Sequence, residues 1–148
     1  MLRKAVFALE ALDQVRVVAV SSIYETEPWG LTEQPNFFNI ALEIETVATP
    51  LELLQMVKTL EMRLGRLPSV RWGPRVIDID LILWGDVVME THALTLPHQR
   101  FRERDFVLTP LAEIAPDAVD PITGDTVHAL SEALTSQPLT RCAEAIYS

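Results

Sequence analysis

Cysteine and glycine are scarce in this chain of 148 residues, and each scarcity excludes a class of site. The single cysteine, Cys142, rules out an intrachain disulfide and favours a reducing compartment. The five glycines are scattered, so no Walker-type glycine loop is available to hold phosphates through backbone amides. No run approaches the roughly 18 apolar residues that a membrane helix needs. The sequence therefore predicts a cytoplasmic protein without a membrane span.

Positive charge is also scarce, because 12 lysines and arginines face 21 acidic residues, a net charge of −9. Nucleic acids and anionic membranes bind basic surfaces, so neither is an expected partner. Seven of the basic residues are nevertheless arginines that gather in two short windows: Arg63, Arg66, Arg71 and Arg75, and Arg100, Arg102 and Arg104. Because the guanidinium fork matches phosphate oxygens, the two windows indicate a site for a small polyanion, with a solvated basic face as the alternative.

What is present is the composition of one folded domain, with 49% hydrophobic and 22% charged residues. A chain of this length can bury a core of its own. No linker, repeat or low-complexity segment divides it, so we expect a single domain over residues 1–148.

Periodicity and punctuation predict an alternation of helices and strands. Helices are expected over residues 2–12, 50–64, 106–114 and 127–135, and strands over residues 15–23, 37–46, 76–84 and 87–89. Residues 25–35 and 66–75 are expected to form loops. Several links between strands are short, which favours an α+β fold with a mainly antiparallel sheet over a doubly wound one.

The helix over residues 50–64 carries the clearest signals. Thr49 is a suitable N-cap, Pro50 suits the first turn, and Glu52 completes a capping box. Gly65 ends the helix. Its buried stripe is expected to consist of leucines and one valine: Leu53, Leu54, Val57, Leu60 and Leu64. Lys58 and Glu61 are expected on a less apolar side.

Two aspartates interrupt the most apolar predicted strand. In an extended chain Asp78 and Asp80 point to one face, roughly 6.6 Å apart along the backbone, while the residues between and beside them face the core. Neighbouring carboxylates repel each other, and a divalent cation removes that repulsion. Hard oxygen ligands with open positions suit magnesium that carries phosphate oxygens. An edge strand with two solvated aspartates is the alternative.

The residues before this strand favour the metal site. Arg71, Trp72 and Arg75 bring positive charge and an aromatic plane close to the aspartates. Magnesium and arginine together are the usual equipment for phosphoryl transfer, in which catalysis is mostly positioning and charge neutralisation.

Five segments resemble the 6-hydroxymethyl-7,8-dihydropterin pyrophosphokinase family of folate biosynthesis, in the family's order across roughly residues 5–120. They are residues 21–30 (SSIYETEPWG), 34–39 (QPNFFN), 71–81 (RWGPRVIDIDL), 94–98 (LTLPH) and 104–108 (RDFVL), together with Glu61, Gly65 and Arg66. The resemblance implies a ferredoxin-like α/β sandwich. It also implies magnesium-dependent transfer of a pyrophosphoryl group from ATP to the pterin alcohol, with release of AMP.

The family's site residues carry over by position. Asp78 and Asp80 would bind two Mg²⁺ ions and would be catalytic together with Arg66 and Arg75. Contacts with ATP are implied for Glu61, Arg71, Trp72, Arg75, Leu81, Thr95, His98 and Arg104. Contacts with the pterin are implied for Thr26, Pro28, Trp29, Phe37, Asn39, Trp72 and Phe106. We expect a monomer or a weak homo-oligomer.

The resemblance is incomplete at the start of the chain. The family begins with a strand and a Gly-Ser-Asn segment before its first helix, whereas Met1 falls in or just before that helix here. We therefore expect either an upstream start or a truncated chain. Two other functions stay open: a truncated, non-catalytic module of the same fold that binds a nucleotide or a protein, and a metal-dependent transferase that uses a nucleotide-sugar.

Overall fold

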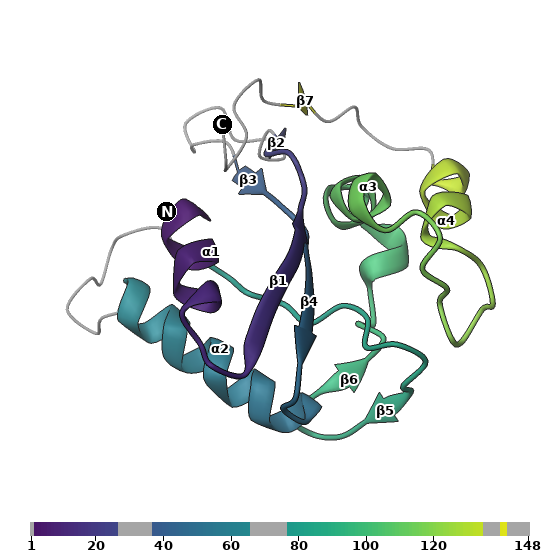
Figure 1. Ribbon diagram of the computed structural model, residues 1–148. Helices are drawn as coiled ribbons and strands as arrows, with labels where there is room; N and C mark the ends of the chain where they lie inside the picture. Colours follow the sequence, from purple (N-terminus) through teal and green to yellow (C-terminus); the bar gives the residue numbers. More distant parts are fainter. Residues whose placement is uncertain (1, 27–36, 66–76, 135–139, 142–148) are drawn as a thin grey trace.

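The computed structural model describes residues 2–26, 37–65, 77–134 and 140–141, and of residues 37, 140 and 141 only the backbone (Figure 1). Strand β1 (Val15–Val20) pairs with β4 (Leu42–Thr46). Strand β2 (Tyr24–Thr26) pairs with β3 (Phe37–Asn39) and with β7 (Thr140–Arg141), and β5 (Met89–Glu90) pairs with β6 (Thr95–Leu96). Every one of these pairs is antiparallel, which confirms the predicted α+β class.

Four α-helices and one short 3₁₀ helix cover the described strands. They are α1 (Leu2–Glu10), α2 (Pro50–Leu64), η1 (Phe101–Glu103), α3 (Asp105–Ile114) and α4 (Val127–Ala133). Figure 1 shows α1 and α2 on one side of the β1–β4 pair and α3 and α4 on the other. All four predicted helices are confirmed, and none of the described helices has the length and apolar character to cross a membrane.

Helix α2 forms for the reasons that its sequence indicates. The backbone N–H of Glu52 donates to Thr49 Oγ1 (3.2 Å), and the N–H of Thr49 donates to Glu52 Oε1 (2.8 Å), so the capping box is complete. Gly65 ends the helix with a φ of 148°, a value that favours glycine. One expectation was wrong: Glu61 does not lie on a less apolar side but is 2% exposed, within the buried stripe.

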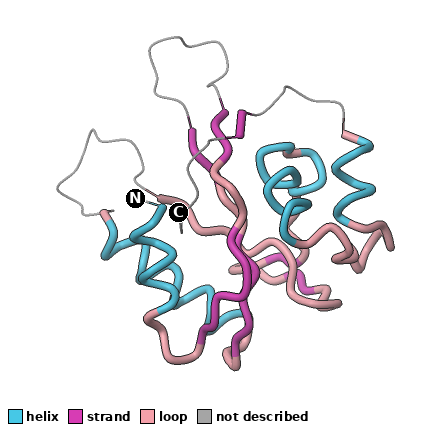
Figure 2. Tube along the Cα trace, turned by 45° about the horizontal axis from the view of Figure 1, so that its top comes forward, coloured by secondary structure: helices cyan, strands magenta, loops and turns pink. Residues whose placement is uncertain are grey.

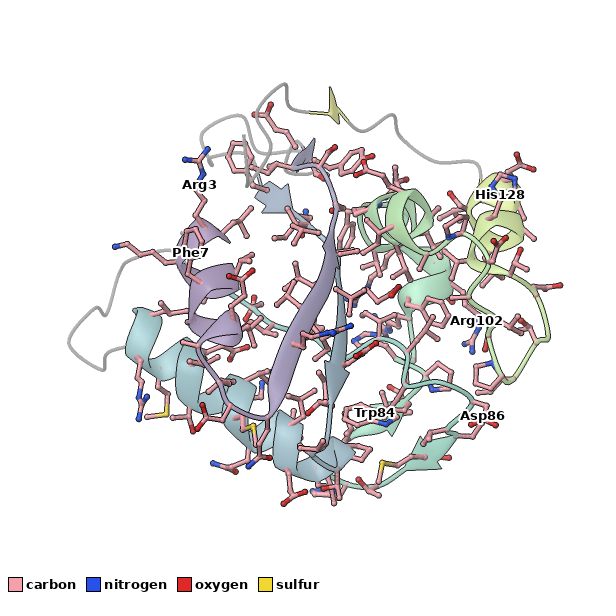
Figure 3. All side chains as sticks on the ribbon, viewed as in Figure 1. Arg3, Phe7, Trp84, Asp86, Arg102 and His128 are labelled. Atoms are coloured by element: carbon pink, nitrogen blue, oxygen red, sulfur yellow. The ribbon has the colours of Figure 1, made fainter. Side chains whose placement is uncertain are left out.

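The core consists of two clusters of apolar side chains. The first lies under α1, α2 and the β1–β4 pair, and its buried members are Leu9, Val15, Ala48, Leu53, Val57 and Leu60. The second lies between η1, α3 and α4, and its buried members are Phe101, Leu108 and Val127. Half-buried side chains of residues 79–84 pack against both clusters, including Trp84, which is labelled in Figure 3 and packs against the first.

The strand predicted over residues 15–23 ends at Val20 as β1, and the strand predicted over residues 37–46 is broken at residues 40–41 into β3 and β4. Ser21 causes the break, because its side-chain oxygen accepts the N–H of Ala41 (2.8 Å) while its own N–H donates to Ala41 O (2.9 Å). Beyond this point β2 pairs with β3 at the far end of β1 and β4, as Figure 2 shows. Strand β2 also occupies residues 25 and 26, which were expected to be loop. Phe38, expected to share a face with Leu42 and Ile44, is 51% exposed instead.

The predicted strand over residues 76–84 is not formed in its described part, residues 77–84. A strand needs a backbone ladder, and none of the described strands pairs with this segment. It is held at separate points: the N–H of Ile79 donates to Glu61 Oε1 (2.7 Å), and the N–H of His98 donates to Ile82 O (2.9 Å). We call residues 77–84 the aspartate segment.

The predicted tight turn after the aspartate segment is present, but the strand pairing around it differs. Val87 N–H donates to Trp84 O (2.9 Å), and Gly85 has a φ of +53°. Residues 87–89 were expected to pair back onto the aspartate segment. Instead, Met89 and Glu90 pair with Leu96 and Thr95, which brings β6 and the residues after it beside the aspartate segment.

Candidate active site

Asp78 and Asp80 project from the aspartate segment into solvent. Both are exposed, whereas Ile77 is buried and the half-buried side chains of Ile79 and Leu81 pack against the first core cluster. The alternation that the sequence predicted is therefore retained although the strand is not formed. Leu81, for which an ATP contact was implied, contributes to the core.

The two carboxylates fit magnesium in a site that the substrate completes. Within the described part of the chain, no group of three or more His, Cys, Asp and Glu side chains is arranged to hold a metal. Magnesium is usually held by one or two carboxylates together with substrate phosphates and waters, not by a closed protein cage. Asp78 and Asp80 supply hard oxygen ligands on an open surface, which is the donor set that such a site requires.

Glu61 holds the aspartate segment against α2. Its Oε1 atom accepts the N–H of Ile79, the residue between the two aspartates, at 2.7 Å. Lys58 Nζ lies 3.8 Å from Oε2 and balances part of the buried charge. The residue that was implied to contact ATP thus has a demonstrable role in fixing the backbone between Asp78 and Asp80.

His98 lies close enough to Asp80 and to Arg104 for both charges to act on its imidazole. His98 follows a cis peptide bond between Leu96 and Pro97. Burial lowers the pKa of His98, the charge of Asp80 opposes this shift, and the charge of Arg104 reinforces it. The lowered pKa favours the neutral imidazole, which lies close to both a carboxylate and a guanidinium. His98 Nδ1 accepts the N–H of Arg100 at 3.3 Å.

The start of α3 combines a positive charge with an aromatic ring. Arg104 precedes the helix, and its carbonyl oxygen accepts the N–H groups of Val107 (3.0 Å) and Leu108 (2.9 Å). Its guanidinium carbon lies 5.7 Å from the centre of the Phe106 ring, within cation–π range. Phe106 is half-buried, so part of the ring is accessible to a flat ligand.

Strands β2 and β3 place Thr26 and Asn39 near α3. Tyr24 lies opposite Asn39 and Thr26 lies opposite Phe37 in their antiparallel register. Helix α3 packs against both strands. Asn39 is half-buried, and the hydroxyl of Thr26 is buried without a hydrogen-bond partner among the described residues. An amide and a hydroxyl in this position can hydrogen-bond the polar edge of a heterocycle.

The remaining implied residues are only partly covered by the structure. Thr95 lies half-buried in β6, three residues before His98. Phe37 is described by its backbone alone. Outside the described residues lie Pro28, Trp29, Arg66, Arg71, Trp72 and Arg75.

Sequence reasoning missed one residue next to this site, Glu113 in the last turn of α3. Its carboxylate accepts hydrogen bonds from the backbone N–H of Ser22 and from the hydroxyl of Tyr24. Ser22 and Tyr24 lie within the resembling segment 21–30, so the segment gave a signal, but nothing in the sequence paired it with Glu113.

Comparison with known proteins identifies the family. The 7,8-dihydro-6-hydroxymethylpterin-pyrophosphokinase family matches residues 1–116. A 2-amino-4-hydroxy-6-hydroxymethyldihydropteridine pyrophosphokinase of Methylorubrum extorquens is 50% identical over 128 residues, which are 86% of this chain and 80% of that protein. The enzyme of the same name from Bacillus subtilis is 50% identical over 76% of this chain and 68% of its own length, and that of Pseudomonas aeruginosa is 40% identical over 78% and 72%. The chain belongs to the 7,8-dihydro-6-hydroxymethylpterin-pyrophosphokinase family.

Proposed function

We propose that this chain transfers a pyrophosphoryl group from ATP to 6-hydroxymethyl-7,8-dihydropterin in folate synthesis, with release of AMP. The observation that carries the proposal is the exposed pair Asp78 and Asp80, together with His98, on which the charges of both Asp80 and Arg104 act. This arrangement lies in a chain that is 50% identical to a named pyrophosphokinase over 86% of its length.

The proposed contacts with ATP are assigned from the charges of the residues. Asp78 and Asp80 would hold the metal, for which we propose two Mg²⁺ ions with ATP, and the metal would supply charge neutralisation at the phosphates. Arg104 contributes a fixed positive charge, and neutral His98 donates or accepts a hydrogen bond without adding charge. Arg66, Arg71, Trp72 and Arg75 are proposed to complete the phosphate contacts. Glu61, Leu81 and Thr95 are proposed to line the adenosine end.

The proposed contacts with the pterin are assigned from the flat shape of its ring and from the hydrogen-bonding groups at the ring edge. Phe106 offers an aromatic face, and Asn39 and Thr26 offer polar groups for the ring edge. Pro28, Trp29, Phe37 and Trp72 are proposed to close the pocket. The pterin hydroxyl then attacks the β-phosphorus and forms a new O–P bond, while the bond from the β-phosphorus to the α-phosphate oxygen breaks so that AMP leaves; the hydroxyl proton is released to solvent. Positioning of the two substrates suffices without a dedicated base.

A ferredoxin-like arrangement is the fold that we propose for the whole domain, since it is implied by the family. The oligomeric state of a monomer or weak homo-oligomer stays a prediction. ATP and the pterin alcohol are the proposed partners.

The direct test is AMP release from ATP and Mg²⁺, measured with and without the pterin alcohol. We expect AMP only with the pterin, and Asp80→Asn should lower the rate by about a hundredfold or more because a metal ligand is lost. Asp86→Asn is the matched control, because Asp86 is an exposed carboxylate in the turn after the aspartate segment (Figure 3). It should retain the wild-type rate.

Three results would contradict the proposal or its assignment of the aspartate pair. ATP binding without pterin-dependent AMP would indicate a non-catalytic binding module of the same fold. A preference for a nucleotide-sugar over ATP would indicate the other transferase class. Equal loss of activity in Asp80→Asn and Asp86→Asn would show that the aspartate pair has no special role.

A further inference from the structure

The carboxylate of Glu113 connects two elements that are distant in the sequence. Glu113 lies in the last turn of α3, and its Oε2 atom accepts the backbone N–H of Ser22 at 2.6 Å. Its Oε1 atom accepts the hydroxyl of Tyr24, also at 2.6 Å. Ser22 lies in the link between β1 and β2, and Tyr24 is the first residue of β2. One side chain therefore holds α3 to the start of β2 through both of its oxygens.

These contacts are strong and their donors are shielded from water. Ser22 and Tyr24 are both buried, whereas Glu113 itself is largely exposed. Hydrogen bonds to an ionised carboxylate are shorter and about twice as strong as neutral ones. A buried phenol that loses its acceptor costs free energy, so the network favours one position of β2 relative to α3.

The two elements that Glu113 joins carry opposite sides of the proposed pterin site. Phe106 lies seven residues before Glu113 on α3, which is about two helical turns and the same helix face. On the β2–β3 pair, Tyr24 of β2 is paired with Asn39 of β3, and Thr26 is the last residue of β2. The separation between the aromatic ring and the polar groups is therefore fixed where Glu113 accepts its hydrogen bonds.

Ser21 fixes the same junction on its other side. Its hydroxyl donates to Ser22 O and accepts the N–H of Ala41, both at 2.8 Å. Ala41 follows β3 by two residues, so the bases of β2 and β3 are tied together while Glu113 ties them to α3. The pair of strands can then move relative to α3 only if the hydrogen bonds of Glu113 break.

We propose that Glu113 is a positioning residue for the pterin: it sets the spacing between Phe106 on α3 and the polar groups Asn39 and Thr26 on the β2–β3 pair. This inference rests on the proposed function. We assign Glu113 no direct contact with a substrate, and its effect should be confined to the pterin because the aspartate segment is held by other residues, Glu61 and His98.

The test is a comparison of the two substrates in Glu113→Ala. We expect the KM for the pterin to rise about tenfold, while the KM for ATP changes by less than about twofold. Tyr24→Phe removes one donor and keeps the ring, so it should raise the pterin KM by a smaller factor. The double variant should be no worse than Glu113→Ala, because both changes break the same interaction. Pterin fluorescence titrations provide a binding measurement that is independent of turnover.

Two control variants separate positioning from general destabilisation. Glu43→Ala removes an exposed carboxylate from β4 and should leave both KM values unchanged. Asp120→Asn breaks a buried ion pair between η1 and the turn before α4, so it should lower stability without changing the pterin KM. If Glu113→Ala does not fold, Tyr24→Phe carries the test.

The outcomes distinguish this inference from the proposed function. No pterin-dependent AMP from the wild type would overturn both. Pterin-dependent AMP from the wild type with an unchanged pterin KM in Glu113→Ala and Tyr24→Phe would overturn the role of Glu113 alone. An equal rise in the KM of ATP and pterin would also overturn it, because the effect would then be a general one.

Discussion

At the residue scale, Asp120 is a buried carboxylate that is held by several hydrogen bonds. Its side chain is 0% exposed, and Arg102, labelled in Figure 3, donates to both carboxylate oxygens through Nε and Nη2. The carboxylate also accepts the N–H of Ile122 (3.0 Å) and the hydroxyl of Thr123 (2.9 Å). The hydrogen bonds from Arg102 are the main reason that the pKa of Asp120 lies well below its usual range.

Replacement of Asp120 by asparagine should destabilise the fold by about 3 kcal/mol, because it leaves the Arg102 guanidinium without its buried partner. Urea unfolding at pH 7 measures the difference. The pKa of Asp120 is lower in the folded state, so the wild type retains this stability above the ordinary carboxyl pKa of about 4 and loses it as the pH falls further.

The free energy of unfolding measured as the pH falls below about 4 supplies the control for this prediction. Asp120→Asn should lack the part of the acid destabilisation that Asp120 causes in the wild type, whereas Asp117→Asn, at an exposed site, should keep it. Parallel losses of stability with falling pH in the wild type and Asp120→Asn would contradict the assignment.

At the element scale, α2 depends on its N-terminal cap. Thr49→Ala removes the oxygen that accepts the N–H of Glu52, and we expect a loss of about 1 kcal/mol in the free energy of unfolding, measured in urea. Thr59→Ala is the matched control, because Thr59 lies in the helix interior, where its hydroxyl donates to Gln55 O (3.0 Å). Alanine is the better helix former there, so stability should be unchanged or slightly higher. Equal losses in both variants would show that the cap is unimportant.

Helices were predictable here because their signals are local. The capping box of α2, its terminal glycine and its apolar spacing all lie within the helix or beside it, and the structure has each of them. Strands depend on partners elsewhere in the chain. The aspartate segment has the composition of a strand, but a glutamate side chain and the backbone of His98 hold it in place of a ladder. The breaks near Ser21 and Ala41 likewise arise from one side-chain hydrogen bond that no periodicity reveals.

Some features of the candidate site were likewise predictable from the local sequence, and others were not. The outward direction of Asp78 and Asp80 follows from alternation with apolar neighbours, so the sequence alone predicted it. The burial of Glu61 and the contacts of Glu113 depend on long-range packing and could not be predicted. Glu113 is one acidic residue among many on the helix surfaces, and only the fold brings it to Ser22 and Tyr24.

At the scale of the whole molecule, the aspartate segment joins the two core clusters. Ile79, Leu81 and Trp84 pack against the cluster under α2, while Ile82 and Leu83 pack against the cluster under α3. The two clusters share eight consecutive residues of backbone, so neither can open fully without disturbing the other. We therefore expect the described domain to unfold as one cooperative unit.

Leu108→Ala tests this cooperativity. Leu108 is fully buried in the second cluster, and its truncation should cost about 3 kcal/mol. Native-state hydrogen exchange should show that the slowest amides of α2, in the first cluster, lose protection by the same free energy as those of α3. Leu51→Ala, at an exposed position on α2, should change neither set. Unchanged protection in α2 would mean that the clusters unfold independently.

The double role of the aspartate segment has a consequence for anyone who wishes to engineer this protein. Its two aspartates belong to the proposed metal site and its apolar side chains pack against the two cores, so a substitution there alters chemistry, packing or both. Thermostability and turnover cannot be tuned separately within these eight residues. Exposed apolar side chains outside the segment, such as Val47 and Ile122, are the safer positions for redesign.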